Sequence, residues 1–143
     1  MIRIVFGVIA GLFAWAIAWL GSEKILSVIS PDGFGAHLRA FQEAIVNGGQ
    51  FTADTGLLLI QIFHSSIVSV MSGVLAARIA GENTRAPLVL AFMLLAFGLL
   101  KAYLSWPYVP IWYHVIFTAL LIPMTILGGK LSRSRQGSRE AGR

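Results

Sequence analysis

Four long apolar runs fill most of the chain, at residues 4–20, 57–77, 88–100 and 111–127. A helix needs about 20 residues to cross the hydrocarbon core of a bilayer, so each run with its flanks predicts one membrane span. We place the spans at about 4–22, 57–77, 87–104 and 111–128. The pattern predicts an all-α membrane protein, a four-transmembrane-helix bundle that forms a single domain over residues 1–129.

The segment between the first two runs predicts a short amphipathic helix over about residues 31–47. Ser30, Pro31 and Asp32 are typical of a helix start, because Ser caps free N–H groups, Pro fits the first turn and Asp favours the positive end of the helix dipole. Asn47 followed by two glycines is typical of a helix end. We expect this helix to cap the bundle on the outer side of the membrane or to contact a partner there. Its apolar positions recur at helical spacing: Phe34, Leu38, Phe41 and Ile45.

The composition is that of a membrane protein rather than a soluble one. Of 143 residues, 57% are hydrophobic and 12% are charged, against about 25% charged in an average soluble domain. The chain has no Cys, which excludes disulfides and thiolate metal sites. It has no phosphate-binding glycine loop, no HExxH zinc motif and no acidic pair inside a span, so we predict that the protein is not an enzyme.

Residues 130–143 form a basic tail, which holds five of the eleven Lys and Arg residues. A basic segment beside a membrane span attracts anionic lipid headgroups, by about 1 kcal/mol for each residue near the surface. Nucleic acid is a weaker candidate, because the tail is short, lacks aromatic residues and is tethered to the bilayer. Its Ser- and Arg-rich composition predicts disorder in isolation. The residues expected to contact headgroups are Lys130, Arg133, Arg135, Arg139 and Arg143.

The distribution of basic residues predicts the orientation, because cytoplasmic segments carry more Lys and Arg than external ones. With the N-terminus inside, eight basic residues lie on the cytoplasmic side and three lie on the outer side. Most Trp and Tyr residues fall at the outer ends of spans one, three and four, where amphipathic rings favour the interface. We therefore predict that both termini are cytoplasmic.

Two spans carry rows of small residues, which let neighbouring helices approach closely. Gly7 and Gly11 form a GxxxG pair in the first span. We favour packing inside this bundle over dimerisation through that pair, because GxxxG alone is a weak signal. The third span is expected to face lipid or a hydrophobic partner, and Gly128 and Gly129 are expected to end the fourth. The row in the second span consists of Ser65, Ser69, Gly73 and Ala77.

Five polar residues map to the outer half of the bundle and form a candidate polar cluster: Glu23, Gln61, His64, Lys101 and His114. We expect Glu23 to lie at the rim of its span, and Lys101 to extend outward to the interface. His64 and His114 could bond within the bundle, line a path for protons or solutes, or bind haem or a metal. The sequence has no metal-ligand spacing, so we predict no metal site and no cofactor.

Several loose features occur together along nearly the whole chain. They are Glu23 after the first run, Ser30-Pro31, Ala-Ala-Arg-Ile-Ala at 76–80, Trp106-Pro107 followed by Trp112, and Pro123 with Gly128. In these features the chain resembles small, uncharacterised four-span bacterial inner-membrane proteins. The resemblance implies a four-span fold and a place in the bacterial inner membrane, and it implies no activity.

Three functions follow as hypotheses. The preferred one is a non-enzymatic accessory or interaction subunit of a larger inner-membrane complex, whose partners are lipids and other membrane proteins or copies of itself. The second is a small transporter or channel with a polar path near His64, Gln61, Glu23 and His114. The third is a redox bundle that binds haem or a metal.

Overall fold

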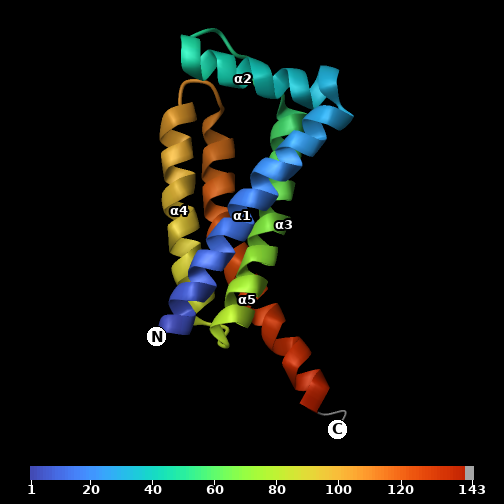
Figure 1. The fold of residues 1–143 in the computed structure, drawn as a ribbon. Coiled ribbons are helices and arrows are strands. Elements are labelled where there is room, and N and C mark those ends of the chain that lie inside the picture. Colours follow the sequence, from blue (N-terminus) through green and yellow to red (C-terminus); the bar gives the residue numbers. More distant parts are fainter. Residues whose placement is uncertain (141–143) are drawn as a thin grey trace.

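Four long helices pack as a bundle in the computed structural model, and a shorter helix lies across one end of them (Figure 1). The structure describes the backbone of residues 1–140 and the side chains of residues 1–132. The prediction of an all-α four-helix bundle is therefore confirmed. The long helices are α1 (Ile2–Ile29), α3 (Thr55–Ala80), α4 (Arg85–Ser105) and α5 (Ile111–Glu140), and the π-helical turn η1 (Pro31–Gly35) leads into the shorter α2 (Ala36–Asn47).

All four long helices are long and apolar enough to cross a membrane, so the protein is a multi-pass membrane protein. The chain begins and α5 finishes at the end of the bundle opposite α2 (Figure 1). We call the two ends the α2 end and the terminal end. The outward faces of the helices carry large exposed apolar side chains, as contact with lipid requires: Phe6, Phe13, Ile17, Phe63, Phe92 and Phe97.

Local signals set the limits of α2 as the sequence predicts. The Ser30 hydroxyl accepts a hydrogen bond from the Phe34 N–H at 3.4 Å, and Gly48 ends the helix with a φ of 69°. The helix start and end predicted on either side of residues 31–47 are both confirmed, although the first turn is a π turn. α1 continues to Ile29, beyond the limit expected at about residue 22, because the first residue that opposes helix is Pro31.

Near the terminal end, α3 and α5 touch backbone to backbone. A Cβ atom added at Gly73 would lie 2.1 Å from the Thr125 carbonyl oxygen, and one added at Gly128 would lie 2.1 Å from the Val70 carbonyl oxygen. Only a residue without a side chain fits such contacts. The expectation that Gly128 and Gly129 end the last span is wrong, because both glycines are packing positions inside a continuous helix.

The small residues of α1 also lie against other helices of the bundle. A Cβ atom at Gly7 would approach the Ala76 carbonyl oxygen of α3 to 2.6 Å, and one at Gly11 would approach the Leu90 side chain of α4 to 2.7 Å. α3 lies among α1, α4 and α5 and is the central helix. The small-residue row of α3 is buried along its length at Ser65, Ser69, Gly73 and Ala77.

α4 faces lipid on one side only. Phe92 and Phe97 are exposed, whereas Gly98 on the other face lets the Leu121 side chain of α5 approach closely. The two faces agree with the expectation that this span faces lipid or a hydrophobic partner, but the sequence did not show which side does which, because a uniformly apolar run gives no contrast between its sides. The buried stripe consists of Ala86, Pro87, Leu90, Ala91, Leu94 and Gly98.

Glu82 organises the turn between α3 and α4. Its carboxylate accepts hydrogen bonds from the backbone N–H groups of Thr84 at 3.1 Å and Arg85 at 2.8 Å, and from that of Ala86. These N–H groups have no partner within the first turn of a helix, and a negative charge suits that end of the helix dipole. One side chain therefore caps the start of α4.

The basic tail begins as a continuation of α5 rather than as the disordered segment expected, since the helix runs to Glu140. The Lys130 side chain is exposed. The side chains of Arg133, Arg135 and Arg139, and the whole of Arg143, lie outside the described residues. Contact of this tail with anionic headgroups stays a prediction.

Candidate functional site

Lys101 lies inside the bundle near the α2 end, surrounded by aromatic rings. Its ammonium nitrogen is 4.6 Å from the centre of the Phe117 ring, 4.7 Å from that of Trp19 and 5.7 Å from that of Tyr113. The negative faces of aromatic rings attract a cation at such distances. The expectation that Lys101 extends outward is wrong, because rings from α1 and α5 hold its charge within the span.

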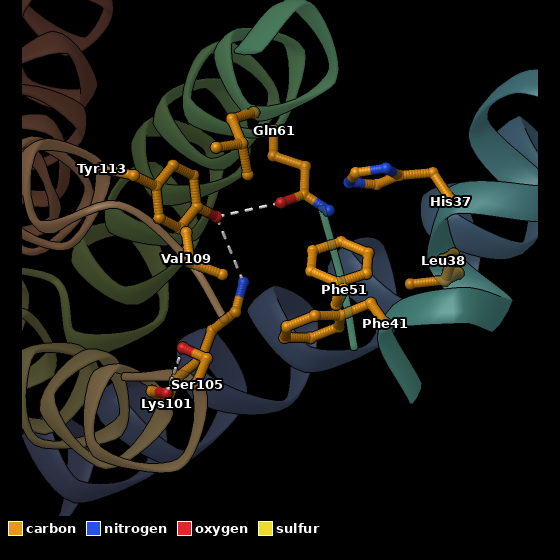
Figure 2. A pocket seen from close by; sticks show the side chains of 10 residues that line it. His37, Leu38, Phe41, Phe51, Gln61, Lys101, Ser105, Val109 and Tyr113 are labelled. Atoms are coloured by element: carbon orange, nitrogen blue, oxygen red, sulfur yellow. Dashed lines mark hydrogen bonds between the residues drawn. The ribbon is translucent and has the colours of Figure 1, made fainter. Parts of the chain in front are cut away.

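A hydrogen-bonded chain joins Lys101 to two other helices, as Figure 2 shows. The Lys101 ammonium donates to the Tyr113 hydroxyl oxygen at 3.4 Å, and the Tyr113 hydroxyl donates to the Gln61 side-chain oxygen at 3.0 Å. The three side chains come from α4, α5 and α3, so the chain fixes these helices against one another. A buried charge requires polar partners of this kind.

Glu23 of α1 adds a negative charge to the same region. Its half-buried carboxylate interacts with the Lys101 charge and with the Trp19 side chain. α1 extends to Ile29, so Glu23 lies within a continuous helix, and its expected position at the rim of the membrane span stays a prediction. Opposite charges near each other lower the cost of placing either in a span. Glu23, Gln61 and Lys101 thus lie in one region of the bundle, and their role as a functional cluster stays a prediction.

α2 and the loop after it form a roof over this site. The Phe51 ring lies 4.8 Å from the His37 ring and 5.3 Å from the Phe41 ring, measured between centres. Beneath them is a cavity of about 20 Å³, whose floor includes Gln61 and Lys101 (Figure 2). A cavity of this size holds about one ordered water molecule. The site is therefore a capped polar cluster rather than an open cleft.

His37 is a titratable group of this roof whose ring lies against Phe51. Burial lowers the pKa of its imidazole, and the nearby carboxylate of Asp54 opposes that shift. Asp54 also caps α3, since its carboxylate accepts a hydrogen bond from the Leu57 N–H at 2.9 Å. The neutral imidazole is thus the form that suits the closed roof.

The other two residues of the candidate cluster are not members of the hydrogen-bonded chain, although the His114 ring centre lies 5.9 Å from that of Tyr113. His64 contacts Ser22 at 2.5 Å, and its ring centre lies 5.1 Å from that of Trp19. His114 stacks on Trp106 with the ring centres 5.4 Å apart and the planes 13° from parallel. The two imidazoles are held by different neighbours.

This arrangement offers little to a metal or haem. Within the part of the chain whose side chains are described, no three His, Asp or Glu residues come together as a ligand group. Ligation of one haem by both His64 and His114 would need the two rings to face one space, and their partners differ. The expectation of no cofactor stays a prediction.

Sequence reasoning missed the aromatic part of the site. Tyr113, Trp19 and Phe117 are all buried in one apolar cluster at the α2 end, although Trp19 and Tyr113 were expected in an interfacial belt. Both residues lie close enough to the ends of their spans for the ring to reach either the interface or the buried cluster. The spacing of Tyr113 and Phe117 by four residues is the one available signal, because it puts both rings on one face of α5.

Comparison with known proteins identifies no relative: no protein-family model, no curated protein and no solved structure matches the chain.

Proposed function

We propose that the protein is a non-enzymatic accessory or interaction subunit of a larger complex in the bacterial inner membrane. Both termini are cytoplasmic in this proposal and α2 is periplasmic, because the excess of Lys and Arg lies at the terminal end. One observation carries the proposal. The interior is closed near the terminal end by backbone contacts, so the protein acts through its surfaces rather than through a path inside it.

The closure supports this function over transport through a single chain. α3 and α5 meet backbone to backbone at Gly73 and Gly128. The neighbouring hydroxyls of Ser72 and Thr125 each donate to a carbonyl of their own helix at 2.7 Å. Hydroxyls bonded in this way have no proton left to donate to a passing anion or solute.

The exposed face of α2 supports contact with a partner on the periplasmic side. Ala44 is buried against the rest of the protein, whereas Val46 is 80% exposed. Arg39 and Glu43, which are also exposed, precede Val46 by seven and three residues, so the three side chains share one face of the helix. An apolar residue among charges of both signs is typical of a protein interface rather than a lipid-headgroup surface.

The test compares two substitutions that place a carboxylate on the same side of the membrane. Membranes containing the wild type, Val46→Glu or Thr52→Glu are cross-linked, extracted gently and analysed by mass spectrometry after affinity purification. Thr52 is exposed in the loop after α2 and serves as the control. We expect a second membrane protein to be recovered in a constant ratio to the wild type and to Thr52→Glu. The ratio should fall with Val46→Glu. Equal recovery with all three, or recovery of self-copies alone, contradicts the proposal.

A small transporter or channel is the second candidate, and one observation favours it. Lys101 is an ionisable residue within a span, beside a cavity, and such residues often mark substrate pathways. In this case purified protein in liposomes should conduct an ion or solute, and Lys101→Met and His64→Leu should abolish the flux. If the protein is instead an accessory subunit, liposomes that contain the wild type or either variant should show the same flux as empty liposomes.

A further inference from the structure

We infer that the protein holds one membrane phospholipid in a groove between α4 and α5, with the lipid ester carbonyl hydrogen-bonded to His114. The groove has a volume of about 370 Å³ and is lined almost wholly by apolar side chains, with Trp106 and His114 near the α2 end and Ile122 deeper. It lies apart from the capped cluster around Lys101. The inference does not depend on the accessory function.

The length of the groove fits a hydrocarbon chain. His114 is three residues into α5, and Ile122 follows eight residues later. At a rise of about 1.5 Å per residue, the groove extends about 12 Å from the level of His114 towards the middle of the bilayer. It therefore begins just below the interface, where the ester groups of phospholipids lie, and it continues where their acyl chains lie.

His114 provides a ring nitrogen, Nε2, that no other group in the described chain bonds. Its Nε2 is the one buried side-chain nitrogen or oxygen without a hydrogen-bond partner among the described side chains. An unsatisfied buried polar atom costs about 1–3 kcal/mol, so a partner for it is strongly favoured. With its proton on Nε2 rather than on Nδ1, where it would face the Val109 backbone carbonyl, the imidazole donates to a carbonyl oxygen. Because Nε2 is buried, the lining side chains must shift to admit that oxygen.

Trp106 marks the level at which the lipid ester would lie. Its indole is 57% exposed and stacks on the His114 ring, as suits a ring at the membrane interface. The indole covers a face of the imidazole and leaves the groove beside it open to an acyl chain. His114 and Trp106 together therefore form the upper end of the groove.

A second groove of similar volume shows why this one is preferred. It lies between α1 and α3, has a volume of about 380 Å³ and includes Ser72 and Arg78 in its lining. The Ser72 hydroxyl already donates to a carbonyl of its own helix, and Arg78 is exposed at the terminal end. Neither residue therefore gives this second groove a buried, unused donor for a lipid ester.

The experiment uses the full-length protein in lipid nanodiscs, followed by stepwise delipidation and native mass spectrometry. His114→Phe keeps a ring that can stack on Trp106 but removes the hydrogen bond. Ala102→Leu fills the groove, and Ala96→Leu adds the same atoms to a different groove on α4 as a control. We expect the wild type and Ala96→Leu to retain one phospholipid, and Ala102→Leu to lose it. His114→Phe should retain it about fivefold less tightly, as the loss of one average hydrogen bond predicts.

A change of lipid tests the ester carbonyl itself. Nanodiscs made from an ether-linked phospholipid keep the acyl-like chain but lack the carbonyl acceptor. We expect the wild type to retain this lipid about fivefold less tightly and so to match His114→Phe, while thermal unfolding shows that both proteins stay folded. Equal retention in ester and ether lipids, equal retention by all variants, or a quinone in place of the phospholipid overturns the inference.

Discussion

The two halves of the bundle satisfy polar groups in opposite ways. Near the terminal end, the hydroxyls of Ser72 and Thr125 bond to carbonyls of their own helices, and contact between helices comes from glycine and alanine. Towards the α2 end, Lys101, Tyr113 and Gln61 bond to one another across three helices. The first half needs close backbone approach, and the second needs particular side chains.

This difference separates packing from chemistry within one small bundle. Backbone contacts near the terminal end leave no freedom in side-chain size, since an added Cβ would lie 2.1 Å from a carbonyl oxygen at Gly73 and at Gly128. At the α2 end the charged groups are covered by α2, and a cavity remains among them. We therefore expect changes near the terminal end to prevent folding, and changes at the α2 end to alter a folded protein.

The largest effect should come from Gly73→Leu. The new side chain collides with the Thr125 carbonyl, which belongs to the backbone of α5 and cannot rotate away. We expect destabilisation of more than about 3 kcal/mol, the upper end of usual overpacking costs. Gly21→Leu is the control, because nothing lies within 4 Å of a Cβ atom there. The measurement is equilibrium unfolding in mixed micelles, and equal stability of the two variants would refute close packing of α3 on α5.

Removal of the Lys101 charge should come next in size. Lys101→Met takes away the hydrogen bond to Tyr113 and leaves Glu23 without its nearby cation, so we expect a loss of about 2 kcal/mol, typical of hydrogen bonds to charged groups. Glu23→Gln in the same protein should recover part of the loss, with a coupling energy of at least about 0.5 kcal/mol. Lys24→Met, at an exposed position, is the control. Additive single and double substitutions would show that Glu23 and Lys101 do not interact.

The cap of α4 predicts a smaller effect that depends on pH. Partial burial raises the pKa of Glu82. Hydrogen bonds from the backbone N–H groups of Ala86, Arg85 and Thr84, together with the charge of Arg85, lower it by more, so that the pKa lies below the ordinary 4.5. The stabilisation is therefore present above pH 4.5 and is lost as the pH falls through the lowered value. Glu82→Gln should cost about 1 kcal/mol at pH 7, as a lost helix cap does. Unfolding curves measured between pH 7 and pH 3 should converge for the wild type and this variant, and parallel curves would contradict the cap.

The roof over the polar cluster should respond least, and in another pH range. Burial lowers the pKa of His37 below the ordinary 6.5, against the opposing effect of Asp54. The folded protein therefore favours the neutral imidazole, and the stability of the closed roof declines as the pH falls from 6.5 through the lowered pKa. Amide hydrogen exchange in α2 should rise relative to α3 between pH 7 and pH 5, after correction for intrinsic rates. His37→Gln should abolish this pH dependence, and an unchanged profile in that variant would assign it to another group.

Helix positions could be predicted from the sequence because each depends on neighbours along the chain. The length of an apolar run identifies a span in lipid, and the limits of α2 follow from Ser30 and Gly48. The facing sides of the spans could not be predicted equally well. A soluble helix marks its buried side by polarity, but Leu90 on the buried face of α4 and Phe92 on the exposed face are equally apolar.

The site was harder to predict, because its decisive contacts join residues from different helices. Lys101 has the position of a residue that extends to the interface, and only Trp19 and Phe117, from α1 and α5, explain why it turns inward. Gly128 shows the same difficulty. As a sequence signal it is typical of a helix end, and only the Val70 carbonyl on α3 explains why a glycine is needed within α5.

Access of a water-soluble thiol reagent to the terminal half tests the central claim most directly. The chain has no Cys, so Gln42→Cys, Ser72→Cys and Arg78→Cys each introduce a unique thiol. In sealed vesicles of both orientations, we expect a membrane-impermeant maleimide to label Gln42→Cys from the periplasmic side and Arg78→Cys from the cytoplasmic side. Ser72→Cys should be labelled from neither side until the protein is unfolded, and labelling of Ser72→Cys in the folded protein would contradict a closed interior.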